Sequence, residues 1–578
     1  MKSTGISKFM RASRSLLALS LMLTASFAFG QFGKMSADLK NLPEGKLVDV
    51  IVQYRITPTQ AHFDQVRAMG GSLRWDLRGM KAGAFRIPAG MLSVLANDPN
   101  VVHISPDRPV QASTYSNNPD FYESAVLVQS AWNQYDGSGV GVAIIDSGIT
   151  NNGEFGSRIL YNQSFVSGQT STADAYGHGT HVAGIVAGGG LNSTGSNFSR
   201  TFVGVANNAN LINLRVLDQN GSGTDSAVIA AIQQAIALKS TYNIRVINLS
   251  LGRGVFESYT QDPLCQAVES AWKAGIVVVV AAGNNGRNNA VATSGYGTIN
   301  APGNDPYVIT VGAMKPEGTP DRADDLIASY SSKGPTLFDH IVKPDLVAPG
   351  NYVISVLAST SATLYSSQNS IPTNYYNSQG STAASTAYFK LNGTSMAAGV
   401  VSGAAALLLE KTPTLTPDQI KARLMKTAYK TFPSSSTATD PSTGLTYTDQ
   451  YDIFTVGAGY LDIQDGMENT DLAPSTVGAA NSPTAAVDAS GNVYLVTGSS
   501  VMWGSSVLWG TQVVWGTSVL NTNTSGESVL WGSSVVWGTS SDTGYSVLWG
   551  ASAASASSVL WGASSQSEAT SVQILGEQ

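Results

Sequence analysis

The chain has 578 residues, enough for two or three domains of roughly 150 residues each. Only 12% of the residues are charged and the formal net charge is −7, and nothing in the sequence resembles the basic footprint of a nucleic-acid-binding protein. The single cysteine, Cys265, excludes an intrachain disulfide and is expected to act as a small buried hydrophobe.

Residues 1–30 have the pattern of a secretory signal peptide. A basic start (Lys2, Lys8, Arg11 and Arg14) precedes an apolar stretch from Leu16 to Phe29. Small residues suitable for cleavage stand at the end of this stretch, in 26–28 or 28–30. The stretch is too short to span a bilayer, which takes about 20 apolar residues. An uncleaved anchor is the alternative. The pattern predicts an extracellular protein, either secreted or at the cell surface.

Residues 46–112 are predicted to form a small α+β unit. Strand-like segments cover 47–54, 72–75, 82–87 and 101–104, and helical spacing covers 57–69 and 89–96. This β-α-β-β-α-β order is ferredoxin-like. A unit of about 65 residues has only a marginal core, so we expect it to depend on a partner surface.

From about residue 120 the pattern changes to apolar strands without alternation. They cover 139–148, 211–217, 246–250, 276–282 and 308–311, and helical stretches at 227–238 and 264–274 lie between them. Such strands fit a parallel sheet buried on both faces, and the alternation with helices predicts a doubly wound, mostly parallel α/β fold. Ligands bind outside the carboxyl ends of such strands, where Asp146, Ser250 and Asn284 stand.

Two further segments complete this domain, which we expect to run from 120 to 467. Residues 355–390 are rich in Ser, Thr, Asn and Tyr and are predicted to be a surface insertion or lid. The segment 393–409 begins Gly-Thr-Ser and continues with almost no polar atoms, which predicts a buried helix with Ser395 at its start. Ser395 is either an ordinary helix cap or a nucleophile in a place that favours negative charge.

A base for Ser395 is found at His178, between two glycines that allow close approach of another backbone. His178 and His181 share one helix face, but a zinc protease would need a Glu between them and a third ligand, so no metal site is predicted and His181 is expected to be structural. His178 can take the serine proton, and a buried Asp146 can orient the imidazole. The Asn284 amide can donate to an oxyanion beside the Ser395 N–H.

These motifs resemble those of the subtilisin-like serine proteases. The matching segments are Ile144–Gly148, Gly177–Gly184, Gly393–Ala397, Gly204–Ala206, Leu249–Gly252, Ala282–Gly286 and Ala348–Gly350. The resemblance covers about 120–467 and implies that Asp146, His178 and Ser395 form the triad, with Asn284 as the oxyanion donor. It also implies a peptide-binding role for Gly221, Ser222, Gly223, Ser250, Leu251, Gly252 and Gly283, which would hold an extended peptide as an added strand.

The resemblance extends more weakly to 46–112, which is similar to the inhibitory propeptide of such enzymes. It implies a zymogen that cuts itself between about 108 and 122. Many members of the family carry Pro where this chain has Gly399, and Gly would relax the first turns of the helix there. No cofactor is needed for the chemistry, and structural calcium stays open, because the loop 191–197 only loosely resembles a calcium site.

Residues 468–578 are expected to be a low-complexity tail. Trp-Gly recurs at 503, 509, 515, 531, 537, 549 and 561, and the segment from 468 onward has seven acidic residues but no Lys or Arg. Many of the spacings are multiples of six, so in an extended chain these tryptophans would share one face. The repeats are compatible with a β-solenoid, a surface ribbon or a segment without fixed fold. They suggest contact with glycans or self-association.

Together these patterns predict a secreted, self-processing serine endopeptidase of the α/β class. Its expected partners are protein or peptide substrates and its own propeptide, and a monomer is expected. The alternative from another class is a non-catalytic surface or adhesion protein that presents the Trp-Gly repeats. A missing member of the triad would favour that alternative, and none is missing from the sequence.

Overall fold

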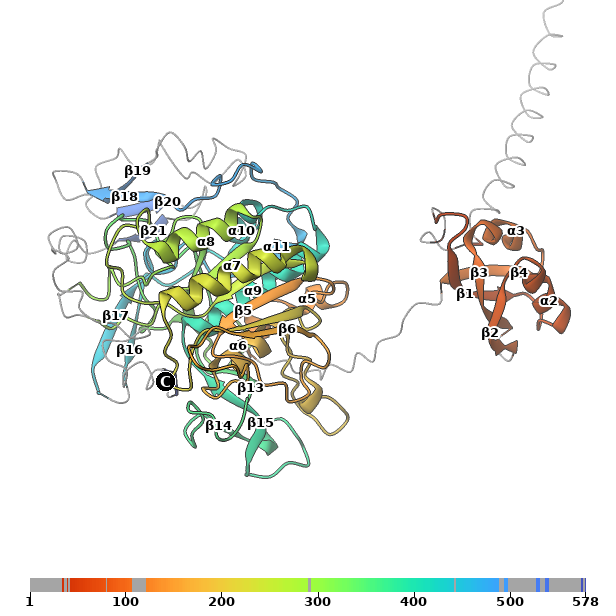
Figure 1. The fold of residues 1–578 in the computed structure, drawn as a ribbon, viewed down its shortest axis with the longest axis horizontal. Helices are drawn as coiled ribbons and strands as arrows, with labels where there is room; N and C mark the ends of the chain where they lie inside the picture. Colours follow the sequence, from red (N-terminus) through yellow and green to blue (C-terminus); the bar gives the residue numbers. More distant parts are fainter. Residues whose placement is uncertain are drawn as a thin grey trace, which may run out of the picture. The chain divides into compact units, whose positions relative to one another are not determined.

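The computed structural model describes residues 34–35, 39, 42–78, 81–106, 121–288, 293–440, 443–487, 493–496, 527–530, 536–539, 573–574 and 577. The chain divides into two units, residues 1–113 and residues 114–578 (Figure 1). The predicted signal peptide and most of the Trp-Gly repeats lie outside the described residues. No described helix has the length and hydrophobicity that crossing a membrane requires.

The first unit has the predicted β-α-β-β-α-β order. Its elements are β1 (Leu47–Tyr54), α2 (Gln60–Ala68), β2 (Ser72–Leu77), β3 (Ala82–Pro88), the short η3 (Ala89–Met91), α3 (Leu92–Ala96) and β4 (Val101–Pro106). The antiparallel sheet has the order β2-β3-β1-β4. Alternate residues of β1 point inward, so Val50, Val52 and Tyr54 are buried against Phe63 and Phe85 in a small core.

The second unit is organised around an eight-stranded sheet. Its strands are β5 (Gly141–Asp146), β6 (Ile159–Ser164), β7 (Asn210–Arg215), β8 (Ile244–Leu249), β9 (Val277–Ala281), β10 (Ile309–Lys315), β11 (Leu326–Ile327) and β12 (Leu346–Pro349). The order is β11-β10-β9-β8-β5-β7-β6, with β12 beside β10, and only β10–β11 is antiparallel. The prediction of a mostly parallel sheet is therefore confirmed.

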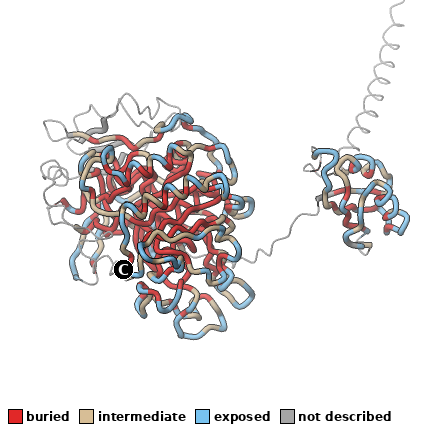
Figure 2. The backbone as a smooth tube through the Cα atoms, viewed as in Figure 1, coloured by how far each residue is buried: buried red, intermediate tan, exposed pale blue. Residues whose placement is uncertain are grey.

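Helices cover the sheet, so that its apolar strands are buried (Figure 2). Helices α6 (His178–Ala187) and α9 (Thr394–Lys411) pack together against it, and α7 (Asp225–Tyr242) and α8 (Pro263–Lys273) form a second pair. Further helices of this unit are α4 (Phe121–Ala125), α5 (Gln129–Trp132), η4 (Leu191–Ser193), α10 (Pro417–Thr427) and α11 (Ile463–Glu468). Helix α9 is buried from Thr394 to Leu409, as its lack of a polar face predicted.

The segment 355–390 is more than the surface insertion or lid that its composition suggested. With neighbouring residues it forms β13 (Val353–Val356), β14 (Ser370–Pro372), the short η5 (Thr373–Tyr375) and β15 (Ala384–Leu391), and the sheet order is β13-β15-β14. The side chains of Tyr388 and Phe389 are fully buried. Because β15 ends at Leu391, the turn before Ser395 follows it directly in the chain.

The chain goes on packing against the second unit beyond the predicted boundary at 467. The Ser482 hydroxyl contacts the buried carboxylate of Asp345 and accepts a hydrogen bond from Lys421 Nζ at 2.9 Å. The backbone of residues 483–485 bonds to that of residues 340–342. Buried charges need such partners, and these polar residues provide them.

Short two-stranded pairs occur late in the chain. They are β16 (Ser435–Thr439) with β17 (Thr446–Gln450), β18 (Thr484–Val487) with β19 (Val493–Val496), and β20 (Glu527–Leu530) with β21 (Val536–Thr539). In the last pair, Trp537 of one Trp-Gly repeat lies opposite Val529. This pairing gives that repeat an extended conformation.

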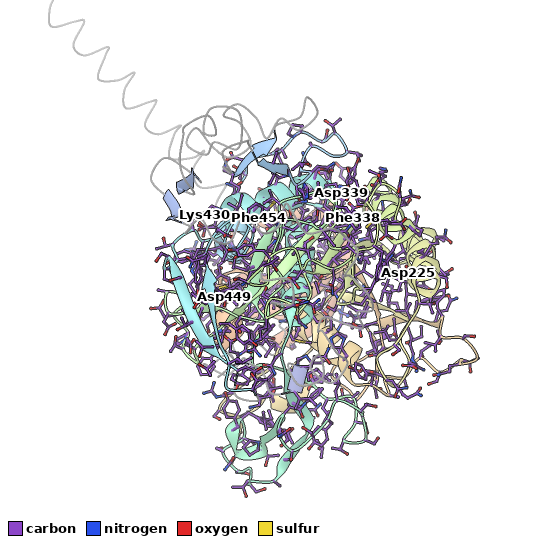
Figure 3. The ribbon with its side chains drawn as sticks, turned by 90° about the vertical axis from the view of Figure 1, so that its left-hand side faces the viewer. Asp225, Phe338, Asp339, Lys430, Asp449 and Phe454 are labelled. Carbon is purple, nitrogen blue, oxygen red and sulfur yellow. The ribbon has the colours of Figure 1, made fainter. Side chains whose placement is uncertain are left out.

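Ion pairs tie outlying segments to the second unit. Arg253 bonds to Asp225, at the start of α7, with 2.8 Å between the closest atoms, and the buried Lys333 pairs with Asp449 on β17. Asp225 and Asp449 lie on opposite sides of the unit in the side-chain view (Figure 3). These pairs hold the start of α7 and the β16–β17 hairpin in place.

Candidate functional site

The carboxyl end of β5 and the start of α6 bring Asp146 and His178 together. Both side chains are buried, with 0% and 2% exposure. Nδ1 of His178 lies 2.8 Å from Oδ1 and 3.0 Å from Oδ2 of Asp146. This contact fixes the plane of the imidazole, and a proton on Nδ1 leaves Nε2 as the ring atom that can accept one.

A second carboxylate, Asp174, holds the first turn of α6. It accepts hydrogen bonds from the Gly177 N–H at 2.7 Å, the Thr180 N–H at 2.8 Å and the Ser147 hydroxyl at 2.8 Å. Asp174 is not among the site residues predicted from the sequence. The sequence feature that could have indicated it is an Asp shortly before the turn that starts a helix, because side-chain oxygens there accept hydrogen bonds from unpaired N–H groups.

The surroundings of the two histidines on α6 shift their pKa values in opposite directions. Burial opposes protonation of His178, but the charge and hydrogen bond of Asp146, with the charge of Asp174, raise its pKa above 6.5. Burial, with the nearby His178, lowers the pKa of His181 to about 3. His181 Nε2 lies 3.1 Å from the carbonyl oxygen of Val353. His181 is therefore a neutral, packed residue.

Ser395 lies in the first turn of α9 and is 6% exposed. Its hydroxyl donates to the carbonyl oxygen of Ser250 at 3.2 Å, and the Ser250 hydroxyl donates to the carbonyl oxygen of Ser395 at 2.7 Å. Nε2 of His178 has no hydrogen-bond partner within the described part of the chain. In enzymes without bound substrate, hydrogen bonds between active-site groups are often long or poorly aligned and tighten when substrate binds.

Asn284 follows β9 and is locked to the turn before Ser395. Its Oδ1 accepts from the Thr394 N–H at 2.9 Å and from the Thr394 hydroxyl at 3.0 Å. The turn depends on Gly393, whose φ is 140° and whose added Cβ would lie 3.0 Å from Asn284 Nδ2. The amide Nδ2 is thus fixed beside the serine turn as a hydrogen-bond donor.

The predicted peptide-binding residues fall into two groups. Ser250, Leu251, Gly252, Gly283 and Asn284 line one small pocket with Thr394 and Ser395. In contrast, Ser222 and Gly223 line a separate depression near the start of α7. The backbone of Gly221 packs closely on the ring of Tyr176, because a Cβ at Gly221 would lie only 2.5 Å from that ring. Tyr176 stands two residues before His178.

No group of three or more His, Cys, Asp or Glu side chains suited to a metal ion occurs among the residues that the structure describes. In the loop 191–197, the N–H groups of Leu191 and Asn192 each donate at 2.8 Å to the carboxylate of Glu154. Cys265 is buried, and its thiol lies 3.3 Å from Oδ1 of Asn304. Neither feature bears on the serine site.

Comparison with known proteins supports one family. Residues 137–459 match the model of the subtilase family, peptidase S8. The serine protease AprX of Bacillus subtilis is 35% identical over 58% of this chain and 71% of that protein, and subtilisin E of the same species is 32% identical over 72% and 94%. Subtilisin DY of Bacillus licheniformis is 39% identical over 51% and 85%. The chain belongs to the subtilase family and is a subtilisin-like serine endopeptidase.

Solved structures are also similar to this chain. One of them is that of a cold adapted subtilisin-like serine proteinase, which is 29% identical, with 55% of this chain and 89% of that chain covered and a TM-score of 0.38.

Proposed function

We propose that Ser395 is the nucleophile, that His178 is the general base and acid, and that Asp146 orients His178. The observation that carries the proposal is the buried Asp146–His178 pair, with contacts of 2.8 and 3.0 Å. This pair lies at the sheet edge where Ser250, which follows the neighbouring strand β8, bonds to Ser395. The raised pKa of His178 fits a group that must accept a proton and then return it.

The reaction then follows in two stages. Ser395 Oγ attacks the peptide carbonyl while His178 Nε2 takes its proton, and the imidazolium is stabilised by Asp146. The oxyanion is bound by Asn284 Nδ2 and by the Ser395 N–H at the start of α9. His178 gives its proton to the leaving amine, and water hydrolyses the acyl-enzyme by the same steps. The chemistry requires no cofactor, because these groups perform every step.

The substrate is held as an extended peptide beside 250–252, and Gly283 belongs to the same pocket. Gly221, Ser222 and Gly223 are proposed as the opposite side of the peptide site. Main-chain hydrogen bonds of this kind supply affinity with broad side-chain tolerance.

A serine-directed fluorophosphonate probe tests the nucleophile. The wild-type chain should be labelled and Ser395→Ala should not, and labelling of both would exclude Ser395. Asn284→Leu should keep labelling but lose about 10²–10³ in turnover, a figure that comes from subtilisin, a member of the same family. Asn285→Leu, at the neighbouring position, is the matched control.

We also propose that the protein is made as a secreted zymogen, with 1–30 as signal peptide and 46–112 as inhibitory propeptide. The ferredoxin-like unit ahead of the protease unit supports this proposal. So does a relative named extracellular serine proteinase, from a Thermus strain, which is 33% identical over 60% of this chain and 70% of that protein. Ser395→Ala should accumulate with 46–112 attached; if it is processed normally, another protease makes the cut.

A further inference from the structure

Gln573 and Glu577 contact residues at and beside the proposed active site, although both stand far from it in the sequence. The carbonyl oxygen of Gln573 accepts hydrogen bonds from the Asn392 N–H at 3.1 Å and from Asn392 Nδ2 at 3.0 Å. Its side-chain Oε1 accepts from the Tyr176 hydroxyl at 3.1 Å. Asn392 begins the serine turn and Tyr176 precedes His178, so Gln573 bonds to both sides of the site.

Gln573 also restricts the pocket beside the nucleophile. It lines that pocket together with Ser395, Asn284 and Ser250, and the remaining volume is about 20 Å³. That volume is about what one water molecule needs. A substrate residue that entered so small a pocket would compete with Gln573 for the space.

Four residues further on, Glu577 fills a carboxylate-binding subsite and is 1% exposed. Its Oε2 lies 2.9 Å from the Arg287 guanidinium and accepts from the Ser329 N–H at 2.9 Å and from the Ser329 hydroxyl. Asn351 holds the backbone, since its Oδ1 accepts from the Glu577 N–H at 2.9 Å and its Nδ2 donates to the Glu577 carbonyl at 2.8 Å.

The groups that bind Glu577 also bond to one another and to a further carboxylate. Arg287 is 9% exposed, donates to the Ser329 hydroxyl at 2.8 Å and also pairs with Asp440 at 3.1 Å. Arg287 thus keeps a carboxylate partner when Glu577 leaves. The subsite is also joined to the nucleophile, because the Gly393 N–H donates at 2.8 Å to the carbonyl of Gly350, next to Asn351.

We propose that Gln573 and Glu577 are intramolecular ligands of the active site, with Glu577 anchored by its carboxylate in the Arg287–Ser329–Asn351 subsite and Gln573 competing with peptide substrates. The inference rests on Ser395 as the proposed nucleophile. A guanidinium with convergent N–H and O–H donors selects a carboxylate. The subsite would therefore also bind an acidic residue of a separate peptide.

The test compares Glu577→Gln with the wild-type chain, using probe labelling and cleavage of an uncharged peptide anilide. The substitution keeps the shape of the side chain but removes the charge, so both rates should rise about ten- to a hundredfold. Glu468→Gln makes the same change at an exposed carboxylate on α11 and should match wild type. Equal rates for Glu577→Gln and wild type would overturn the inference.

A peptide added in trans gives an independent measurement. A synthetic peptide with the sequence of residues 571–578 should inhibit the Glu577→Gln chain competitively, and the same peptide with Gln at 577 should inhibit at least tenfold less. Equal inhibition by both peptides, or by neither, would overturn the role of the carboxylate. If no chain is labelled at all, the proposed nucleophile fails first and the inference fails with it.

Discussion

At the scale of single residues, the charge of Asp174 raises the pKa of His178. Asp174→Asn should shift the acid limb of the pH profile of kcat/KM to lower pH, because the Asp174 charge helps to raise the His178 pKa and catalysis needs the neutral imidazole. It should also cost about 1–3 kcal/mol of stability, since the amide that replaces one oxygen cannot accept.

The control for this prediction is Asp321→Asn, in an exposed loop. It should leave both the profile and the stability unchanged. An acid limb that stays in place in Asp174→Asn would show that the carboxylate acts only on structure.

His181 predicts how stability depends on pH. Its pKa is about 3 in the folded state and 6.5 ordinarily, so below pH 6.5 only the unfolded chain gains a proton. This contribution to stability is complete above pH 6.5 and is lost as pH falls toward 3. Between pH 7 and pH 5 wild type should lose about 2 kcal/mol more than His181→Gln, whose amide can still reach the Val353 carbonyl.

Urea unfolding at the two pH values, in a Ser395→Ala background that prevents self-digestion, measures this difference. Equal losses in the two chains would show that His181 is protonated in the folded protein.

The positions of the proposed triad could be predicted because each residue stands at the edge of an apolar element. Asp146 ends a buried strand, His178 starts a helix between glycines, and Ser395 precedes an apolar helix. Gln573 and Glu577 could not be predicted in this way. Their contacts cross more than 180 residues of sequence, and no local pattern marks them.

At the scale of elements, strands with a local apolar pattern could be predicted, and strands that depend on pairing with distant segments could not. Strand β9 is a continuous apolar run, β8 is apolar except for Arg245 and Asn248, and both were predicted within a few residues. Strand β6 has partly exposed, alternating residues, and β15 is rich in Ser, Thr and Tyr, so neither has the composition of a buried parallel strand. They are positioned by pairing with neighbours.

The glycines of α9 set how closely that helix packs. A Cβ at Gly403 would lie 2.5 Å from Cβ of Val205, whereas a Cβ at Gly399 would meet Cγ2 of Ile185 at 3.2 Å. Gly403→Ala should therefore destabilise the protein by about 1–3 kcal/mol, the range for overpacked cores. Gly399→Ala, at the position where many subtilases carry Pro, should cost less.

Thermal unfolding of both variants in a Ser395→Ala background is the measurement. A larger loss for Gly399→Ala than for Gly403→Ala would mean that the contact of α9 with α6 is the tighter one.

At the scale of the whole molecule, residues 480–485 stabilise the second unit by bonding to its buried charged side chains. The Ala480 N–H donates at 2.8 Å to Asp418, and Ser482 contacts the buried Asp345 and Lys421. A chain that ends at residue 470 should thus be less stable than one that ends at 490 by about 3 kcal/mol or more, because buried charges lose their partners.

Both shortened chains lack residues 573–577, so their comparison measures the contacts of residues 471–490, which include those of 480–485. The melting temperatures, again with Ser395→Ala, should differ by several degrees. Equal values would show that water replaces these contacts without cost.

The resting position of the Ser395 hydroxyl has a kinetic consequence. Side-chain rotation takes picoseconds to nanoseconds and turnover typically takes about a millisecond or longer, so rotation toward His178 acts only through the fraction of hydroxyls already turned. A bond to the Ser250 carbonyl of about 1 kcal/mol would hold that fraction near one in six. A substrate N–H that donates to the Ser250 carbonyl would replace the Ser395 hydroxyl there. The bound peptide would thus raise the fraction of Ser395 hydroxyls that are turned toward His178.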